Sequence, residues 1–417
     1  MKRIIVSGFA FLALAMSAAV AVPQVSNVTM KQAGGSRLVT VTYRLDAPAI
    51  VTFDIQTNGT SIGAVNLTNA VGDLNKVVSK VGETCTIKWQ PMDSWPDHIV
   101  NDRSARAVVT AWSKLSPPDY MIVSLTERSN AVFYASADAI PGGVTNRLYK
   151  TQRMAMRRIH AAGVRFRMGS LINESGRDNR EIPHDVTFTN DYYMGVYPVT
   201  IDQLRRIMGN AAASNSRFYG CKDWEVRPAN KMSHALLRGV DWSSLNPSHA
   251  VNTADGYYIA AFRNTTGIEL DLPTEAQWEF ACRAGTTSPF NDGTSSMDAV
   301  GWNSSNWAND PNCTSNETHA VGLLKPNAWG LYDMHGNVDE MCLDWFAGGI
   351  YYTDGREAVE PPGPDQSRES VPYRAVRGGN WNSAASSARS AKRNFQTKWE
   401  GAGTLGLRFC CPVQFPY

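Results

Sequence analysis

The adjacent prolines Pro117-Pro118 divide the chain into two parts with different sequence patterns. Before them, short runs of alternating apolar and polar residues recur, with Gly, Asp and Pro in between. After them, Trp, Asn, Gly and Pro are scattered throughout, and helix signals are few. Two prolines in a row interrupt both helices and sheets. A chain of 417 residues divided in this way is predicted to hold two domains of different classes.

The first part reads as a set of β-strands. Residues 39–45 alternate apolar and polar side chains, residues 49–55 are rich in β-branched residues, and Asn58-Gly59 follows as a hairpin turn. Turn signals at intervals of roughly ten to fifteen residues suit a β-sandwich. Residues 22–115 are therefore predicted to form an all-β sandwich that resembles the immunoglobulin-like modules of exported bacterial proteins. It is expected to act in spacing or docking, and residues 116–155 to form a connector with strand-like pieces.

The amino-terminus has the three parts of a secretory signal peptide. Lys2-Arg3 are positive, an apolar run follows, and Ala19-Val20-Ala21 is a small-x-small cleavage site. A membrane anchor is the alternative, but the apolar run is short. No later segment approaches the ~20 apolar residues that span a bilayer. Residues 1–21 are therefore predicted to be removed, and the mature chain to be secreted, periplasmic or at the cell surface.

Charge and cysteine content exclude several classes of function. The net charge is +2, and basic residues never run longer than a pair such as Arg157-Arg158, which argues against nucleic-acid binding and electrostatic membrane attachment. All seven cysteines lie after the predicted cleavage site, and disulfides are permitted in an exported chain. No Cys-x-x-Cys spacing occurs, which argues against a zinc ribbon or a thioredoxin-like site.

Two capping boxes mark helices in the second part. Thr200 precedes Gln203, and Thr274 precedes Gln277, each at the spacing in which the two side chains satisfy each other's free backbone donors. A third helix is predicted over residues 254–264. The remaining sequence of this part reads as loops with short strands.

Several segments of the second part, in order, resemble the formylglycine-generating (sulfatase-modifying factor) family. They are residues 164–170, 193–200, 272–285, 326–345, 377–379 and 405–408. The resemblance implies the family's fold for residues 156–417, an α+β, C-type-lectin-like core with long irregular segments. It does not by itself carry the family's activity over to this chain.

The family's enzymes bind copper through two cysteines that follow the Arg-Gly-Gly segment. Counted from Gly378-Gly379, those positions are Ser383 and Ala388. Copper(I) is soft and selects thiolates; a serine hydroxyl does not replace one, and alanine offers no ligand. Copper binding and cysteine oxidation are therefore not expected here, and no catalytic residue is assigned.

What remains of that segment is a set of small polar residues around one aromatic and one cation. A groove lined by such side chains suits a peptide, protein or polar small-molecule ligand, and diversified ligand-binding members of the superfamily carry a similar Arg-Gly-Gly-x-Trp-Asn segment. The alternative is that Trp381 packs into the core and the serines form a solvated turn. The predicted lining consists of Asn380, Trp381, Asn382, Ser383, Ser386, Ser387 and Arg389.

The resemblance also implies a structural calcium site. Its ligands would be the side chains of Asp333 and Glu340 and the carbonyls of Gly336 and Val338. Two carboxylates on one loop suit an ion that takes six to eight oxygens. The alternative is that Asp333 caps a turn and Glu340 makes a salt bridge. The neighbouring His335 is expected to be packed and hydrogen-bonded.

The family's structural disulfide would map onto Cys282 and Cys410, with Cys411 as the other choice of partner. Cys85, Cys221, Cys313 and Cys342 stay unassigned.

The leading interpretation is an exported two-domain protein that binds a ligand or protein partner through the groove and does not oxidise cysteine. The alternatives are a divergent metal-dependent oxidoreductase on the same groove and a structural module of the cell surface. A transition metal in the groove would favour the oxidoreductase, and saturable binding without turnover would favour the first interpretation.

Overall fold

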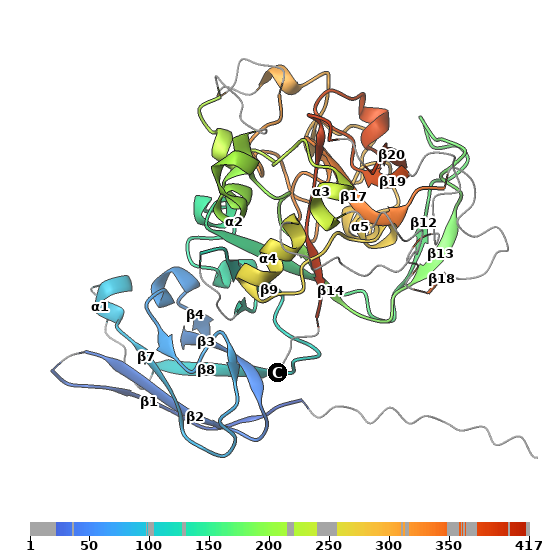
Figure 1. Cartoon of the computed structure of the whole chain (residues 1–417). Helices are drawn as coiled ribbons and strands as arrows, with labels where there is room; N and C mark the ends of the chain where they lie inside the picture. The colour runs from blue at the N-terminus through green and yellow to red at the C-terminus, as the bar shows by residue number, and fades with distance from the viewer. Residues whose placement is uncertain are drawn as a thin grey trace, which may run out of the picture.

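Strands dominate the structure and helices are few (Figure 1). The computed structural model describes residues 22–35, 37–96, 98, 104–126, 131–214, 221–239, 257–309, 312, 317–347, 358–359, 361, 363, 373–398 and 401–413. The predicted signal peptide lies outside these residues. Within them, no helix has the length and apolar character needed to cross a bilayer.

The amino-terminal part consists of two small sheets that share one apolar core. The first sheet has the order β1 (Val25–Gln32), β2 (Val39–Leu45), β7 (Cys85–Trp89) and β5 (Val71–Gly72). The second contains β4 (Thr60–Ser61), β3 (Ala49–Thr57) and β6 (Val77–Val78), with β8 (Ala105–Trp112) paired to β3. The strands predicted at 39–45 and 49–55 are therefore confirmed.

Alternation explains how these sheets close on each other. Val39, Val41 and Tyr43 of β2 have no exposed surface, and the residues between them are half-buried. Successive side chains of a strand point to opposite faces, so every second residue of β2 enters the core between the sheets. The hairpin after β3 uses Asn58 and Gly59 at φ 50° and 82°, the left-handed pair that a two-residue turn requires.

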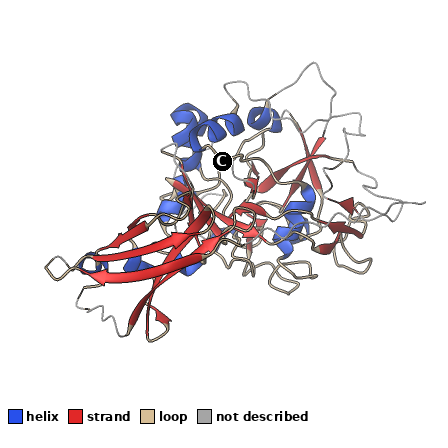
Figure 2. Ribbon diagram, turned by 90° about the horizontal axis from the view of Figure 1, so that it is seen from below, coloured by secondary structure: helices blue, strands red, loops and turns tan. Residues whose placement is uncertain are grey.

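The strand-like pieces predicted in the connector, residues 116–155, are strands of the central sheet. That sheet has the order β10 (Val132–Tyr134), β9 (Tyr120–Ser124), β11 (Arg153–Ile159), β14 (Tyr192–Gly195) and β22 (Cys410–Pro412). The boundary expected between residues 155 and 156 falls inside β11. The sheet therefore joins the connector, the start of the second part and the carboxy-terminal strand. Figure 2 shows the strands of the whole chain in red, with few helices among them.

Three further small sheets build the rest of the second part. Their orders are β12 (Arg165–Met168), β13 (His184–Thr187), β18 (Ala358–Val359); β20 (Asn394–Thr397), β19 (Tyr373–Arg377), β17 (Asp339–Trp345), β21 (Leu405–Gly406); and β15 (Gly301–Trp302), β16 (His335–Gly336). Long loops connect them, as the resemblance implied.

Both capping boxes are confirmed at helix starts. Thr274 accepts from the Gln277 backbone N–H and Gln277 bonds back to Thr274 at the start of α5. Thr200 and Gln203 make the same exchange before α2, whose helix is interrupted at Gly209 with φ 79°. The helices are α1 (Pro91–Ser94), α2 (Ile201–Ser214), α3 (His234–Arg238), α4 (Tyr258–Thr266) and α5 (Glu275–Arg283). The start of the third predicted helix, residues 254–256, lies outside the described residues.

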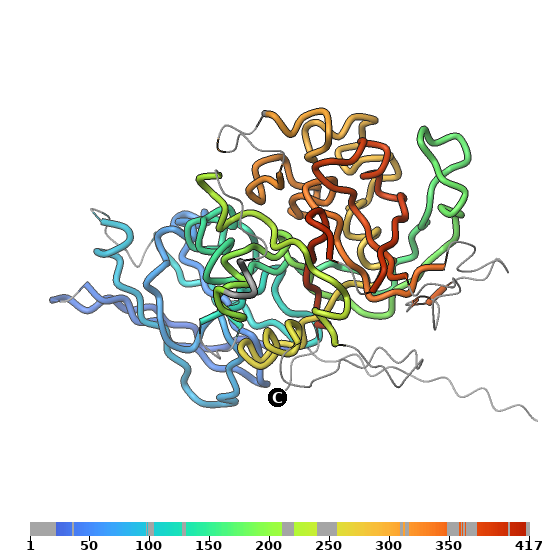
Figure 3. The backbone as a smooth tube through the Cα atoms, turned by 45° about the horizontal axis from the view of Figure 1, so that its top comes forward, coloured from blue at the N-terminus to red at the C-terminus, as the bar shows by residue number. Residues whose placement is uncertain are grey.

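The two parts of the chain are in direct contact. Ile50 of β3 belongs to the same buried apolar cluster as Met121, Val123 and Phe133 of the central sheet. The Phe133 backbone N–H donates to the Asn75 carbonyl at 2.9 Å. In Figure 3 the amino-terminal strands lie against the segment that follows them.

Candidate functional site

The chain reverses direction directly after β19, at two glycines with positive φ, of which Gly379 has no room for a side chain. Gly378 and Gly379 have φ of 95° and 68°. A Cβ on Gly379 would lie 2.9 Å from Ala388, because the segment folds back so that residue 388 covers residue 379. This close approach requires glycine.

The Ser383 side chain closes the turn that follows. Its Oγ donates to the Asn380 carbonyl at 2.8 Å and accepts from the Asn380 N–H at 2.9 Å. Both hydrogen-bonding functions of the hydroxyl are therefore used locally. Ala388 has no exposed surface and packs in an apolar cluster with Phe290, Met297 and Val300.

The other predicted groove residues differ in exposure. Asn382 and Ser386 are exposed, whereas Asn380, Trp381, Ser383 and Ser387 are half-buried. The Trp381 N–H donates to the Asn337 carbonyl at 3.1 Å, so its backbone is fixed although its ring is not in the buried core. Together these residues form a polar, partly exposed surface. We call residues 380–387 the polar turn.

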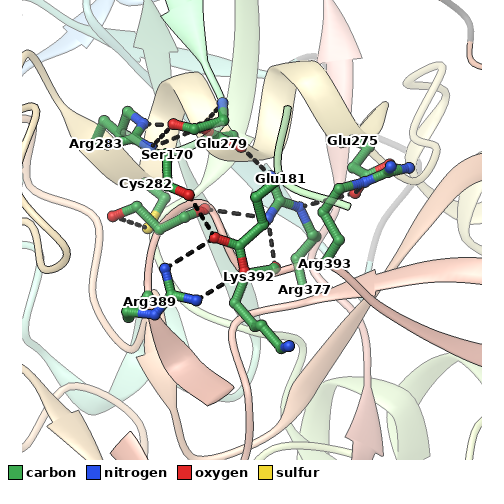
Figure 4. A network of polar contacts seen from close by, with 12 residues as sticks. Ser170, Glu181, Glu275, Glu279, Cys282, Arg283, Arg377, Arg389, Lys392 and Arg393 are labelled. Carbon is green, nitrogen blue, oxygen red and sulfur yellow. Dashed lines mark hydrogen bonds and ion pairs between the residues drawn. The ribbon is translucent and has the colours of Figure 1, made fainter. Parts of the chain in front are cut away.

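Arg389 does not belong to this surface, which corrects its assignment as a groove cation. Its side chain is 2% exposed, and its guanidinium binds Glu181 at 2.7 Å and contacts Glu174. Glu181 has no exposed surface. Figure 4 shows Arg389 and Glu181 pointing toward each other within a larger buried network. Arg389 therefore anchors the loop of residues 174–181 beneath the polar turn.

The rest of that network joins helix α5 to strand β19 and the segment after the polar turn. Glu279 pairs with Arg283 one turn later at 2.8 Å, as the spacing suggests, and also with Arg377. Glu275 accepts two hydrogen bonds from Arg393, at 2.7 and 2.9 Å. These buried charges are paired, so they hold backbone segments in place.

His335 is packed and hydrogen-bonded, as expected. Its Nδ1 donates to the Ala388 carbonyl at 2.7 Å, and its Nε2 accepts from the Asn291 N–H at 3.0 Å. Burial lowers the pKa of His335 to about 4, so the ring is neutral at pH 7. Both ring nitrogens are committed to the backbone.

The disulfide predicted between Cys282 and Cys410 is not formed. Both thiols are free and buried, as is Cys411. The Sγ of Cys282, near the end of α5, lies 3.7 Å from His335 Nε2, whereas the Sγ of Cys410 on β22 lies 3.9 Å from Gln277 Oε1. The two thiols face different neighbours. Burial raises the pKa of Cys282 to about 12, so it is no nucleophile at neutral pH.

The two carboxylates of the predicted calcium site have protein partners. Glu340 has no exposed surface and binds Arg408 through both oxygens, with a closest distance of 2.7 Å. Its Oε2 also accepts from Trp278 Nε1 at 2.7 Å. Asp333 is buried and accepts from the Gly322 N–H at 2.7 Å, and burial raises its pKa. Calcium binding at this loop therefore stays a prediction, beside the alternative in which Asp333 caps a turn and Glu340 makes a salt bridge.

Asp339 is the site residue that sequence reasoning missed. It lies at the start of β17, between Val338 and Glu340 of the predicted calcium loop, and its Oδ2 accepts from Asn380 Nδ2 at 2.6 Å. Its Oδ1 is buried without a hydrogen-bond partner among the described residues. Burial raises the pKa of Asp339 to about 6. Successive residues of a strand face opposite sides, so Asp339 faces the polar turn while Glu340 points into the core. This alternation is the sequence signal from which Asp339 could have been predicted as a site residue.

A family model for the "Sulfatase-modifying factor enzyme 1-like domain" matches residues 146–411. The chain belongs to this family. The match begins ten residues before the domain boundary predicted at residue 156, and it includes β11 completely.

The chain is similar to curated proteins of several kinds. The formylglycine-generating enzyme of Thermomonospora curvata is 29% identical over 293 residues, which cover 62% of this chain and 94% of that enzyme. The serine/threonine-protein kinase pkn1 of Chlamydia caviae is 27% identical over 264 residues, which cover 62% of this chain and 38% of the kinase. This chain thus spans well under half the length of the kinases that it matches.

Solved structures of similar proteins include Treponema denticola variable protein 1. It is 25% identical, with a TM-score of 0.45 over 62% of this chain and 95% of that one. PvdO from Pseudomonas aeruginosa is 23% identical, with a TM-score of 0.45 over 62% of this chain and 94% of that one.

Within the sulfatase-modifying factor family fold, the positions that the sequence aligns with the copper cysteines hold no thiol. Ser383 closes a turn with its hydroxyl, and Ala388 is part of an apolar cluster. Cys282 is buried, and its Sγ contacts His335 Nε2 and Ser390 Oγ.

Proposed function

We propose that this chain is an exported member of the sulfatase-modifying factor family that binds a peptide, protein or polar small molecule at the polar turn and does not oxidise cysteine. The observation that carries the proposal is the state of the two aligned copper positions. Ser383 uses its hydroxyl within its own turn, and Ala388 is fully buried in an apolar cluster. Neither supplies the soft ligand that copper(I) requires.

Unsatisfied polar atoms around the polar turn support a binding role. Asp339 Oδ1, Trp302 Nε1 and Thr318 Oγ1 are buried side-chain atoms without a hydrogen-bond partner among the described residues. Trp302 lies next to this surface, because the Asn337 N–H donates to its carbonyl and Trp381 donates to that of Asn337. Buried polar groups are normally satisfied, so a polar ligand with donors and acceptors is the natural partner for these atoms.

Selection of peptides on the immobilised mature chain tests this role. We expect peptides selected from a random library to bind the wild type at least about tenfold more tightly than the variant Ser386→Arg, because the exposed Ser386 lies in the polar turn. Leu323→Arg, at a residue 48% exposed outside the polar turn, is the matched control and keeps the affinity. Equal binding to all three proteins, or no enrichment, would refute the proposed surface.

Loss of the family's oxidase activity has its own assay. A sulfatase peptide that contains the substrate cysteine is incubated aerobically with copper-loaded protein, and aldehyde formation is followed by mass spectrometry. We expect no aldehyde. Turnover would support the alternative of a metal-dependent oxidoreductase, and neither turnover nor ligand binding would favour a structural module of the cell surface.

Calcium at Asp333, Gly336, Val338 and Glu340 stays a proposal that competes with the Glu340–Arg408 ion pair. Binding to the native state alone raises the free energy of unfolding, by about 2.7 kcal/mol at a hundredfold excess over Kd. A calcium-dependent rise of the unfolding temperature that Asp333→Asn abolishes would support calcium. Identical melting in calcium and in chelator would refute the calcium site and leave Glu340 with its contacts to Arg408 and Trp278.

The role of the amino-terminal part is proposed on architecture. Its two sheets around one core suit an immunoglobulin-like sandwich that spaces or docks the family domain. Export rests on the sequence of residues 1–21. Edman sequencing of the protein recovered from the exported fraction tests both export and the expected cleavage after residue 21.

A further inference from the structure

A cavity of about 680 Å³ lies where the amino-terminal sheets meet the segment after β9. Its walls come from β3, β8, the loop that contains the short 3-10 turn Ala64–Leu67, and residues 132–141. A volume of roughly 300–1,000 Å³ and a position between two parts of a chain are typical of small-molecule sites. All residues that line the cavity belong to the described part of the chain.

Strand register explains the floor of the cavity. Asp54 pairs with Val108, and Thr52 with Thr110, across the antiparallel strands β3 and β8. Val51 and Ile55 enter the sandwich core, so their neighbours in β3 point to the outer face. Residues 132–141 face this outer side of the strand pair and form the opposite wall of the cavity.

The charges that line this cavity all have one sign. Asp54 and Asp138 supply its two carboxylates, and no Lys, Arg or His lines it. Asp54 is half-buried and accepts from Ser61 Oγ at 2.8 Å with one oxygen. Asp138 is exposed at the rim and makes no hydrogen bond or ion pair with a described residue. Burial raises the pKa of Asp54, which is the response of a carboxylate without a cation beside it.

The rest of the lining offers apolar and aromatic surface. Leu67, Leu74 and Val132 line it from three different segments. The hydroxyl of Tyr134 has no hydrogen-bond partner among the described residues, and burial raises its pKa to about 12, so it remains a donor. Apolar walls with a few convergent polar groups are the usual make-up of a ligand pocket.

We propose that this cavity binds a small organic cation, an amine with an apolar or aromatic body. The ammonium group pairs with Asp54 and Asp138, and the body packs against the apolar wall. A charge-assisted hydrogen bond to a half-buried carboxylate is stronger than a neutral one, so the cavity selects against anions and uncharged analogues. None of its residues belongs to the polar turn, so the proposal is independent of the function proposed above.

Calorimetric titration of the full mature chain with three related compounds tests the proposal. Phenethylammonium is the probe, with 2-phenylethanol as the neutral analogue and 3-phenylpropanoate as the anion. We expect one saturable site for the cation, binding at least about tenfold weaker for the alcohol, and none for the anion. No saturable binding of the cation, or equal affinity for all three, would overturn the proposal.

Charge-neutral variants locate the site. Asp54→Asn is expected to weaken phenethylammonium binding about tenfold, and Asp138→Asn, at the exposed rim, about threefold. Glu83→Gln makes the same change of charge at an exposed position outside the cavity and keeps the affinity. Equal weakening by all three would assign the effect to general electrostatics and sink the proposal. Because Asp138 is exposed, its variant gives a readout even where Asp54→Asn lowers the unfolding temperature.

Discussion

Replacement of Arg389 by methionine separates the structural role of this residue from a ligand-binding role. Methionine fills much of the same volume without charge. In the wild type the guanidinium makes two hydrogen bonds to Glu181, at 2.7 and 2.9 Å, and reaches Glu174 as well. In the variant, Glu181 keeps only the Ser170 hydroxyl and the Asp178 N–H as partners.

The size of the effect follows from the burial of Glu181, which has no exposed surface. Removal of one partner from a buried ion pair leaves an uncompensated charge, which costs roughly 3–5 kcal/mol. For a domain of this size, each kcal/mol corresponds to about 2–4 °C, so we expect the unfolding temperature to fall by roughly 6–20 °C. The double variant Arg389→Met/Glu181→Met removes both charges and is expected to recover most of the loss.

Urea unfolding followed by tryptophan fluorescence measures these differences. Lys392→Met is the matched control, because its pair with Asp178 at 3.1 Å is partly solvated and is worth about 1 kcal/mol or less. A loss of less than about 1 kcal/mol for Arg389→Met would refute the structural role. If peptide binding were lost instead, the sequence-based assignment of Arg389 to the groove would be restored.

Three further predictions test the site at other points. Gly379→Ala is expected to lower the free energy of unfolding by about 1–3 kcal/mol, because the φ of Gly379 is 68° and a Cβ would lie 2.9 Å from Ala388. Gly403→Ala is the control and should change stability little, because no atom lies within 4 Å of a Cβ at that position. Burial raises the pKa of Asp339 to about 6, above the unfolded value of about 4. Its contribution to stability is therefore present below about pH 4 and is lost as the pH rises through 6. In urea unfolding over this range, the free energy of unfolding of the wild type should fall relative to that of Asp339→Asn as the pH rises. Iodoacetamide should label Cys282 and Cys410 only after unfolding without reductant, since both thiols are buried and free; absence of labelling in the unfolded chain would indicate a disulfide.

The parts of the fold that the sequence predicts are those with local causes. The Thr274–Gln277 box starts a helix because both partners lie within one turn, and Gly267 ends α4 at φ 72°. The alternation of residues 39–45 predicts β2 for the same reason. Pairing between distant segments has no such local signal. β22 lies beside β14, and their partners Pro412 and Tyr192 are far apart in the chain, so no pattern near either strand predicts the central sheet.

The candidate site divides in the same way. The exposure of Asn382 and Ser386 follows from a polar turn and was predictable. Arg389 resembled a groove cation because its neighbours in sequence are small and polar, but its partners Glu174 and Glu181 lie more than 200 residues earlier. An ion pair across such a separation becomes visible only once the loop of residues 174–181 is folded against the turn.

Buried arginines hold the loops of the family domain in place without a contribution from Ser383 or from a side-chain polar group at residue 388. A loop-rich domain has few sheet ladders to satisfy its backbone, so side chains must fix the loops. Arg408 donates to the carbonyls of Gly195 and Tyr332 while it pairs with Glu340, and Arg377 and Arg389 hold other segments in the same manner. None of these contacts passes through residue 383, and residue 388 contributes only its backbone carbonyl and a methyl group. The contacts that fix the loops therefore place no demand for thiols on these two positions, which supports the proposal that this chain binds a ligand there and does not oxidise cysteine.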